Sequence, residues 1–494
     1  MMFNSLTFIC FFAVILVPLF LPNFKIRRIW LLFVSVLFYS FWNPSYVLLL
    51  FYCILVTYCS GLLIGKFQGS TIKQKLFLTL GIILELIVLF VFKYQNMMIE
   101  FLNSVLIHIK ITINHRSSLI LPIGISFYTF QTIGYMIDVY RGKIKASKNI
   151  IEYALFVSFF PQLVAGPIER SENLIGQIKD LEKIEAWNLP RIRQGLYTML
   201  WGFFMKVVIA DRAALIADTV FKNYRILGSV ELLIGILCFS VQIYCDFGGY
   251  SAIAIGAAKI MGIDLMENFN TPYFAGSIKD FWNRWHISLS TWFRDYLYIP
   301  LGGNRKGKIK KYRNIMIIFL LSGLWHGAEW SFVFWGGLHG LYLILEDMTS
   351  SARERLIKKL KINDSCFSWK LLQALIVFAL TAFAWIFFRA GNLSEAVEYI
   401  CRLFSAHDPW ILFDGGIYTF GVPAIEYSLF FVSLLVLITV DSLYLKTGKK
   451  LDALLQDQNM WFRWAVVLIL LCGCIFFNCS ANGVSAHQFI YFQF

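Results

Sequence analysis

The chain has 494 residues, of which 58% are hydrophobic, 17% are aromatic and only 15% are charged. A soluble domain usually carries about 25% charged residues, so this composition excludes an ordinary soluble protein and predicts an all-α polytopic membrane protein. The net charge of +14 is interpreted as cytoplasmic loops in contact with membrane lipids, because anionic head groups attract basic residues. It is not read as a nucleic-acid site, and the alternating ten-residue pattern of an outer-membrane barrel is absent from the sequence.

Long apolar runs predict the helices in chain order. Residues 6–22 are not preceded by basic residues and lack a small-residue cleavage site, so they are predicted to be a retained first helix and not a removed signal peptide. Residues 150–165 form a short apolar segment that ends in FFPQLVAGP, where Pro161, Gly166 and Pro167 break a helix, so a re-entrant or interfacial element is predicted. Other predicted helices, which bring the total to about ten to twelve spans, are 76–94, 119–140, 195–220, 229–262, 314–347, 370–388, 425–445 and 462–480.

Basic loops predict the orientation, because Lys and Arg are enriched on the cytoplasmic side. Placing the successive basic loops inside puts the N-terminus on the extracytoplasmic side. The loops used for this assignment contain Lys25, Arg27, Arg28, Lys66, Lys73, Lys75, Arg141, Lys143, Lys145 and Lys148. The ten cysteines are scattered, without a paired spacing such as C-x-x-C, so we expect buried thiols and no metal site.

The segment FWNRWHISLSTWFRDYLYIPLGG, residues 281–303, combines a histidine, arginines and many aromatic rings. Drawn as one helix at 100° per residue, it has a polar side and an apolar side. The polar side carries Arg284, Ser288, Thr291 and Asp295, and the apolar side carries Trp282, Leu289, Phe293 and Tyr296. His286 falls on the apolar side, so it is predicted to be either a structural core histidine or a functional one.

A second histidine lies in the segment LSGLWHGAEW, residues 321–330. Counted from a cytoplasmic boundary near Asn314, His326 is about 18 Å along a helix, close to the middle of a ~30 Å hydrocarbon core. An ionisable group at that depth needs a structural or functional reason. The nearby glycines, which would let another backbone or a ligand approach, are Gly323, Gly327, Gly336 and Gly337. A hydrogen bond to a neighbouring helix is the alternative to a functional role.

Other polar groups in apolar runs are open to two interpretations. Asp246 is either the structural partner of an arginine or lysine, or a residue of the substrate pathway. Glu85 is interpreted as a packing or pairing residue, and Gln131, Tyr135 and Asp138 are expected to face protein. The histidines interpreted as structural are His108, His115, His339 and His407.

The two histidine segments resemble those of the membrane-bound O-acyltransferase family, specifically its alginate O-acetyltransferase-like branch. Supporting segments are FNSLTFICFFAVIL, LPIGISFYTFQTIGYMIDVYRG, FFPQLVAGPIERSENLIGQ and YCDFGGYSAIAIG. The resemblance is dense over residues 1 to about 350 and looser beyond. It implies a helical bundle around a funnel or tunnel, in a multi-pass protein of the bacterial cytoplasmic (inner) membrane. Asn283 stands where the alginate enzymes have arginine, which leaves the acceptor sugar open.

The resemblance implies His326 and His286 as the catalytic residues. A cytoplasmic acyl thioester, acetyl-CoA or a related donor, would give its acyl group to a hydroxyl of an extracytoplasmic glycan or of an esterase-like relay protein. No bound cofactor or metal is expected. The residues expected to bind substrate or donor are Trp282, Asn283, Arg284, Trp285, Arg294, Asp295, Trp325 and Asp246.

Physical chemistry gives each part of this site a role. A basic rim attracts the phosphates of the donor. Desolvation keeps His326 neutral, so that it can accept the proton of the acceptor hydroxyl as a general base. The residues of the rim are Arg284, Arg294, Arg305, Lys306, Lys308, Lys310, Lys311 and Arg313.

Three alternatives to O-acetyl transfer stay open from the sequence alone. They are D-alanyl transfer from a phosphopantetheinyl carrier protein, a transporter or channel, and a structural subunit of an export complex. The whole chain, residues 1–494, is predicted to be one membrane domain with N-terminal spans (1–148), a catalytic core (149–350) and C-terminal spans (351–494).

Overall fold

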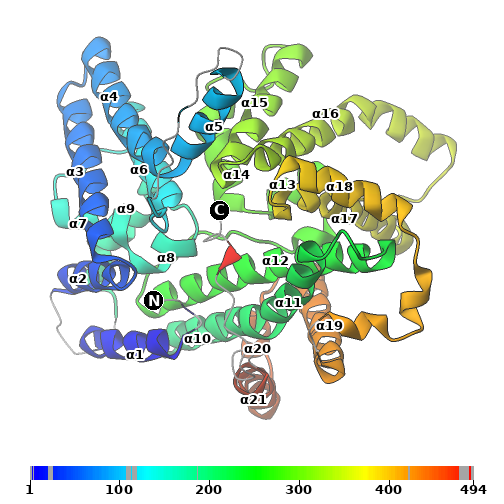
Figure 1. The fold of residues 1–494 in the computed structure, drawn as a ribbon. Coiled ribbons are helices and arrows are strands. Elements are labelled where there is room, and N and C mark those ends of the chain that lie inside the picture. Colours follow the sequence, from blue (N-terminus) through cyan, green and yellow to red (C-terminus); the bar gives the residue numbers. More distant parts are fainter. Residues whose placement is uncertain are drawn as a thin grey trace. The chain divides into compact units, whose positions relative to one another are not determined.

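The computed structural model describes residues 3, 5–20, 26–106, 113, 119–185, 187–420, 423–477 and 489–490, and every regular element within them is a helix (Figure 1). The predicted all-α fold is therefore confirmed. Lys25, His108 and His115 lie outside the described residues.

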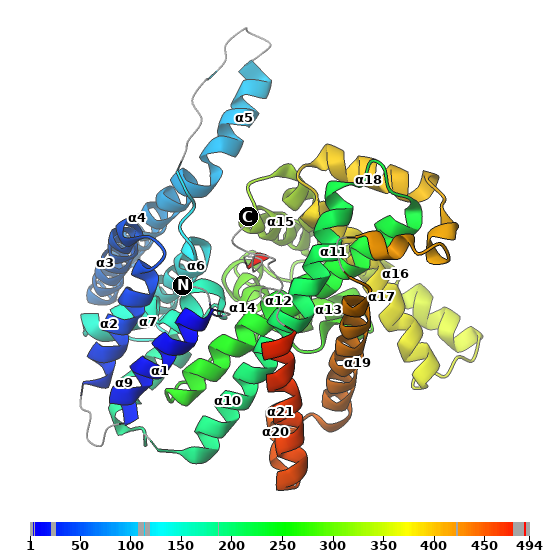
Figure 2. The same ribbon diagram turned by 60° about the horizontal axis from the view of Figure 1, so that its bottom comes forward.

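The helices form two compact units, and unit 1 comprises Met1–Met199 and Ser251–Met266. In it α3, α4 and α6 pack against one another, and α2 packs on α7. Figure 2 shows α5 extending from the end of α4. The elements of this unit are α1 (Leu6–Phe20), α2 (Arg27–Ser40), α3 (Pro44–Lys66), α4 (Thr71–Leu89), η1 (Phe90–Tyr94), α5 (Gln95–Leu106), α6 (Ile125–Tyr140), α7 (Ile150–Ser158), α8 (Phe160–Ala165), α9 (Ser171–Asp180) and η3 (Leu181–Lys183).

Unit 2 comprises Leu200–Tyr250 and Glu267–Phe494, and it contains both histidine segments. Two helices, α10 (Leu189–Phe203) and α12 (Ser229–Ile260), contribute residues to both units. The other elements are η4 (Phe204–Ala210), α11 (Asp211–Lys222), η5 (Pro272–Phe274), α13 (Ile278–Arg284), α14 (Ile287–Phe293), η6 (Arg294–Tyr298), α15 (Lys308–His326), α16 (Trp330–Lys359), α17 (Phe367–Arg389), α18 (Leu393–Ser405), η7 (Pro409–Leu412), η8 (Gly416–Thr419), α19 (Ala424–Thr447), α20 (Leu451–Gln456) and α21 (Met460–Phe476).

Five helices in the described part of the chain are long and apolar enough to cross a membrane, which identifies a multi-span membrane protein. They are Pro44–Lys66, Thr71–Leu106, Ser229–Ile260, Phe367–Arg389 and Ala424–Thr447. The helices α1 and α21 are apolar but shorter. The expectation of ten to twelve spans stays a prediction, because several other helices are too short or too charged for these criteria.

The short apolar segment at 150–165 is indeed interrupted, but the break comes earlier than predicted. It lies at Phe159, between α7 and α8, and Pro161 stands in the first turn of α8. Proline is tolerated in a first helical turn, since the amide hydrogen that it lacks has no partner within the helix there. The proline therefore starts a helix here instead of ending one.

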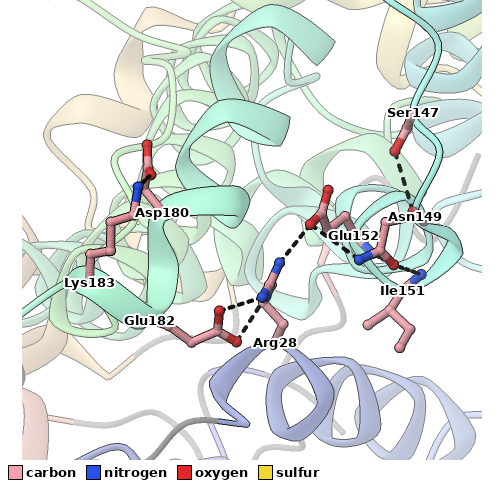
Figure 3. A network of polar contacts seen from close by, with 8 residues as sticks. All are labelled: Arg28, Ser147, Asn149, Ile151, Glu152, Asp180, Glu182 and Lys183. Carbon is pink, nitrogen blue, oxygen red and sulfur yellow. Dashed lines mark hydrogen bonds and ion pairs between the residues drawn. The ribbon is translucent and has the colours of Figure 1, made fainter.

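An arginine on α2 joins three elements of unit 1. Figure 3 shows Arg28 between two carboxylates, with Nη1 2.6 Å from Glu152 of α7 and Nη2 2.5 Å from Glu182 of η3. The Asn149 side chain caps α7 and also donates to Glu152 at 3.2 Å. Arg28, which the sequence assigns to a cytoplasmic basic loop, therefore also has a structural role, because its part-buried ion pairs connect α2 to α7 and η3.

Glycines allow the close packing of α15 on α16, which form an antiparallel hairpin just after His326. A β-carbon on Gly323 would lie 2.2 Å from the carbonyl oxygen of Phe332, and one on Gly336 would lie 2.1 Å from that of Phe319. Both clashes are with backbone, so only glycine fits. The predicted close approach of another backbone is confirmed at these two glycines.

Candidate active site

The helix predicted through 281–303 is wrong in one respect, because the chain breaks at His286. Helix α13 ends at Arg284 and α14 begins at Ile287, and His286 between them has a left-handed backbone with φ of 44°. A continuous helix would require a negative φ at this position. The predicted apolar face survives the break, since Trp282, Leu289, Phe293 and Tyr296 are all buried. Ser288, which was expected on the polar face, is also buried.

Backbone hydrogen bonds from a neighbouring loop hold this break. The carbonyl of Asn268 accepts from the amide of Ile287 at 2.9 Å, and the amide of Asn270 donates to the carbonyl of Arg284 at 2.9 Å. The Asn268 side chain also accepts from the hydroxyl of Ser288 at 2.6 Å. A left-handed residue costs about 1–3 kcal/mol when it is not glycine and persists where its surroundings fix it. Such a conformation, held on both sides, points to a functional position.

His326 is the last residue of α15, and the chain turns there into the hairpin with α16. Its ring is 3% exposed and the ring of His286 is fully buried. The two ring centroids lie 6.1 Å apart, and Trp325 contacts both rings. The two histidines that the sequence singled out are therefore neighbours, although 40 residues separate them in the chain.

Besides Trp325, aromatic rings from three further helices enclose the two imidazoles. Phe247 of α12 lies edge-on to His286 at 4.7 Å between centroids. Trp335 of α16 and Phe388 of α17 lie edge-on to His326 at 5.0 and 5.4 Å. A wall of this kind excludes water and favours neutral imidazole. Burial lowers the pKa of His286 to about 3.

A cavity of about 430 Å³ opens beside α14 and α15. Its wall includes Ile287, which follows His286, and Ser322, which is one turn before His326. Of the predicted donor-binding residues, Trp282, Asn283 and Arg294 line it. The other lining residues are Lys279, Leu289, Ser290, Thr291, Phe293, Tyr298, Ile315, Ile318, Phe319 and Leu343. The cavity is the size of a small-molecule site.

The remaining predicted donor-binding residues lie elsewhere. Arg284 pairs with Asp280 at 2.9 Å, and Asp295 pairs with Arg294 at 2.8 Å. Trp285 is packed in the core, with Phe281 stacked on it at 5.5 Å between centroids. Trp325 contacts the histidines and does not line this cavity. Donor contact by these four residues stays a prediction.

Asp246 belongs to a buried ionic cluster. Its carboxylate lies 2.5 Å from the ammonium of Lys206, which also lies 2.8 Å from Asp211, and the side chains are 1–3% exposed. The other oxygen of Asp246 accepts from the amide of Ile490 at 2.7 Å. Asp246 therefore has the lysine partner that the sequence allowed. The lysine itself was missed, although a basic residue inside the apolar run 195–220 was a signal for it.

His339, interpreted from sequence as structural, lies in the same aromatic cluster. Its Nδ1 accepts from the indole of Trp282 at 3.3 Å, and its ring is 5.1 Å from that of Trp335. It is fully buried. The motif G-G-L-H-G, which places glycines around it, was the only sequence signal for this proximity.

Two buried imidazoles beside a cavity lined by cations, an amide and aromatic rings form the candidate active site. Within the described part of the chain, no group of three or more His, Cys, Asp or Glu side chains is arranged to hold a metal ion.

Comparisons with known proteins identify the class. Residues 143–388 match the model of the membrane-bound O-acyltransferase family. A protein of Pseudomonas syringae pv. tomato named "Probable alginate O-acetylase AlgI" is 38% identical over 83% of this chain and 76% of its own. The peptidoglycan O-acetyltransferase of Helicobacter pylori is 38% identical over 76% of this chain and 73% of its own. The teichoic acid D-alanyltransferase of Bacillus subtilis is 32% identical over 46% of this chain and 59% of its own. The chain belongs to the membrane-bound O-acyltransferase family, and it is an O-acyltransferase.

Proposed function

We propose that this enzyme moves an acetyl group from a cytoplasmic thioester, acetyl-CoA or a related donor, to a hydroxyl of an extracytoplasmic polysaccharide or of an esterase-like relay protein. The resemblance to O-acetylating relatives covers more than three quarters of the chain, whereas the D-alanyltransferase of Bacillus subtilis matches less than half of it. The names of the O-acetylating relatives refer to envelope polysaccharides, which supports a polysaccharide acceptor.

The orientation follows from the basic loops. We place the protein in the bacterial cytoplasmic membrane with its N-terminus outside. The basic residues before α15 and those at the end of α16 then lie in the cytoplasm, as the positive-inside rule expects. Helix α17 leaves the cytoplasmic side near Lys370 and ends outside at Arg389.

The 430 Å³ cavity is the proposed donor site. Lys279 and Arg294 bring two cations to it and attract the polyanionic head of a nucleotide thioester. Asn283 offers an amide for the peptide-like pantetheine arm, and Trp282 supplies an aromatic wall. The exposed basic residues before and at the start of α15, Arg305, Lys306, Lys308 and Lys310, extend this positive surface.

His326 is the proposed general base. Its imidazole takes the proton of the acceptor hydroxyl while that oxygen attacks the thioester carbonyl carbon. The new C–O bond forms, the C–S bond breaks, and the proton passes to the departing thiolate. General-base assistance of this kind typically contributes about 10²–10⁴-fold to the rate. The deep burial of the ring among Trp325, Trp335 and Phe388 supports an imidazole from which water is excluded.

Helix lengths support a position for His326 beyond the membrane centre. Helix α15 rises ~18 Å between Asn314 and His326, and ~27 Å when counted from Lys308. Helix α17 rises ~27 Å between Lys370 and Phe388, whose ring packs on His326. An acceptor that approaches from outside therefore has the shorter path, and a slender thioester arm must cover the longer one.

The test is acetyl transfer by purified protein supplied with radiolabelled acetyl-CoA. We expect His326→Ala to remove acetylated product while the variant still reaches the membrane and unfolds at the same temperature. The matched control is His407→Ala, because His407 is an exposed histidine far along the chain from both motifs. His286→Ala is expected to reduce transfer by disturbing passage of the donor. Normal product formation by His326→Ala would contradict the assigned role.

D-alanyl transfer from a carrier protein is the second candidate, favoured by the match to the teichoic acid D-alanyltransferases. Parallel assays with acetyl-CoA and with a D-alanyl carrier protein separate the two donors. Transfer from the carrier alone would replace the acetyl assignment and would leave the role of His326 in place. The family assignment removes the transporter alternative.

A further inference from the structure

A second cavity, of about 340 Å³, lies where α11, α17 and α18 end or begin, within unit 2. The residues that line it are Asp218, Phe221, Lys222, Tyr224, Arg389, Ala390, Gly391, Glu395 and Tyr399. None of these residues lines the proposed donor cavity. We call it the outer cavity.

Two connections place the outer cavity at the far ends of membrane helices. Arg389 is the last residue of α17, a candidate membrane span whose first residues follow the basic segment at 353–361. Helix α12, another candidate span, begins at Ser229, and its first amide donates to Ala406 after α18. With the basic loops in the cytoplasm, the outer cavity therefore opens on the extracytoplasmic side.

Two consecutive residues link the wall of the outer cavity to the packing around the proposed catalytic base. Phe388 is 1% exposed and lies edge-on to His326 at 5.4 Å between ring centroids. Arg389 follows it and lines the outer cavity, and its guanidinium lies over Phe221 at 5.5 Å. The wall of the cavity and the packing around His326 are therefore continuous along the chain.

The lining of the outer cavity carries groups that recognise hydroxyls. Arg389 pairs with Asp218 at 2.6 Å, and these side chains are 24% and 36% exposed, so both are accessible. Lys222 and Glu395 add a further cation and carboxylate. Tyr399 stacks on Phe221 at 4.6 Å between centroids and the Arg389 guanidinium lies over Phe221, so these rings support the wall of the cavity. The hydroxyls at the edge of a sugar ring match the polar groups of this lining.

We propose that the outer cavity binds one sugar unit of the acceptor polysaccharide, outside the enclosed surroundings of His326. This rests on the proposed function and names its acceptor site. The volume is near the lower end for small-molecule sites, which fits a sugar unit. A docked protein would need a face of about 800 Å² per partner, and the outer cavity is a compact recess with mixed charge. In one wall the carboxylates accept hydrogen bonds from sugar hydroxyls, and the guanidinium donates to hydroxyl oxygens.

Graded filling of the cavity tests the proposal. Ala390 lines the cavity in extended backbone after the end of α17, so larger side chains fit its conformation and project into the recess. The variants are Ala390→Val, Ala390→Leu and Ala390→Trp. The control is Ser394→Trp, which adds the same bulk at an exposed position that does not line the cavity. Full-length protein in lipid nanodiscs is assayed with acetyl-CoA and unacetylated alginate oligosaccharide, and in a second arm with a peptidoglycan glycan fragment.

The half-saturating acceptor concentration is expected to rise with side-chain volume, reaching at least tenfold in Ala390→Trp. Binding of acetyl-CoA and the unfolding temperature should stay within experimental error, and Ser394→Trp should stay within twofold of the unmodified enzyme. Unchanged acceptor saturation in Ala390→Trp would overturn the proposal. So would loss of transfer to a relay protein with transfer to sugar unaffected, since the cavity would then be a protein-docking site. Failure of the proposed function looks different, because the unmodified enzyme would consume no thioester.

Discussion

Gly336 holds the active-site hairpin together, and its replacement by alanine is a sharp test of this structure. The added β-carbon would lie 2.1 Å from the carbonyl oxygen of Phe319 and 3.1 Å from the α-carbon of Gly323. Neither atom belongs to a flexible side chain. Helices α15 and α16 must therefore separate by about 1 Å, since packed interiors leave no room to absorb the contact.

The cost has two parts. Overpacking a tight contact costs about 1–3 kcal/mol, against which alanine recovers up to about 1 kcal/mol of helix propensity. His326 follows Gly323 by three residues on the displaced helix, and a misplacement of about 1 Å at a catalytic group can cost about 100-fold in rate. We therefore expect Gly336→Ala to destabilise the protein by about 1–2 kcal/mol and to lower the transfer rate by about 100-fold.

The matched control is Gly337→Ala, one residue further on the same helix. Its β-carbon would meet only the Cδ2 atom of Leu320, at 3.4 Å, which is ordinary contact. The assays are thermal unfolding in detergent and the initial rate of acetyl transfer. The control should match or exceed the stability of the unmodified protein and keep its rate. If Gly336→Ala and Gly337→Ala behave alike, the helices are not packed as described.

Two further predictions concern buried charge. Burial lowers the pKa of His286 from 6.5 to about 3. Below pH 6.5 the unfolded chain therefore binds a proton that the folded chain does not bind. The contribution of the neutral ring to stability is fully present above pH 6.5 and is lost progressively as the pH falls toward 3. Between pH 6.5 and 4.5 unmodified protein should lose about 2 kcal/mol more than His286→Asn, measured by unfolding at each pH; equal losses would contradict a buried neutral ring. Lys206→Met leaves Asp211 and Asp246 facing each other without a cation, so it should destabilise by about 3–5 kcal/mol, and Lys206→Met with Asp246→Asn should recover part of this in unfolding measurements. If the double variant is no more stable than Lys206→Met alone, the uncompensated charge of Asp246 contributes little to the destabilisation.

The features that could be predicted from the sequence are those that depend on residues close together in the chain. Apolar runs located the spans at 229–262 and 370–388, and the apolar face of the 281–303 segment holds the residues that are buried. The hairpin glycines were also readable, since small residues permit close helix contacts. Each of these features depends on residues that lie within one or two helical turns of one another.

Features set by distant residues could not be predicted. The break at His286 depends on backbone bonds from Asn268 and Asn270, which precede it by a loop. The partner of Asp246 is a lysine 40 residues earlier, and the ring beside His326 comes from Phe388, 62 residues later. Periodicity within a segment carries no information about such contacts, so the helix through 281–303 was drawn as continuous.

Because His286 has a left-handed backbone, a residue at this position must meet two separate requirements: it must adopt a positive φ, and it must carry an imidazole. Glycine, asparagine and aspartate adopt this conformation with little penalty but carry no imidazole, whereas glutamine and alanine lose the ring and also strain the turn. Saturation mutagenesis of this position would therefore give two groups of variants. Residues that tolerate the left-handed backbone should fold but not react, and residues that do not tolerate it should fold poorly and be expressed at a lower level.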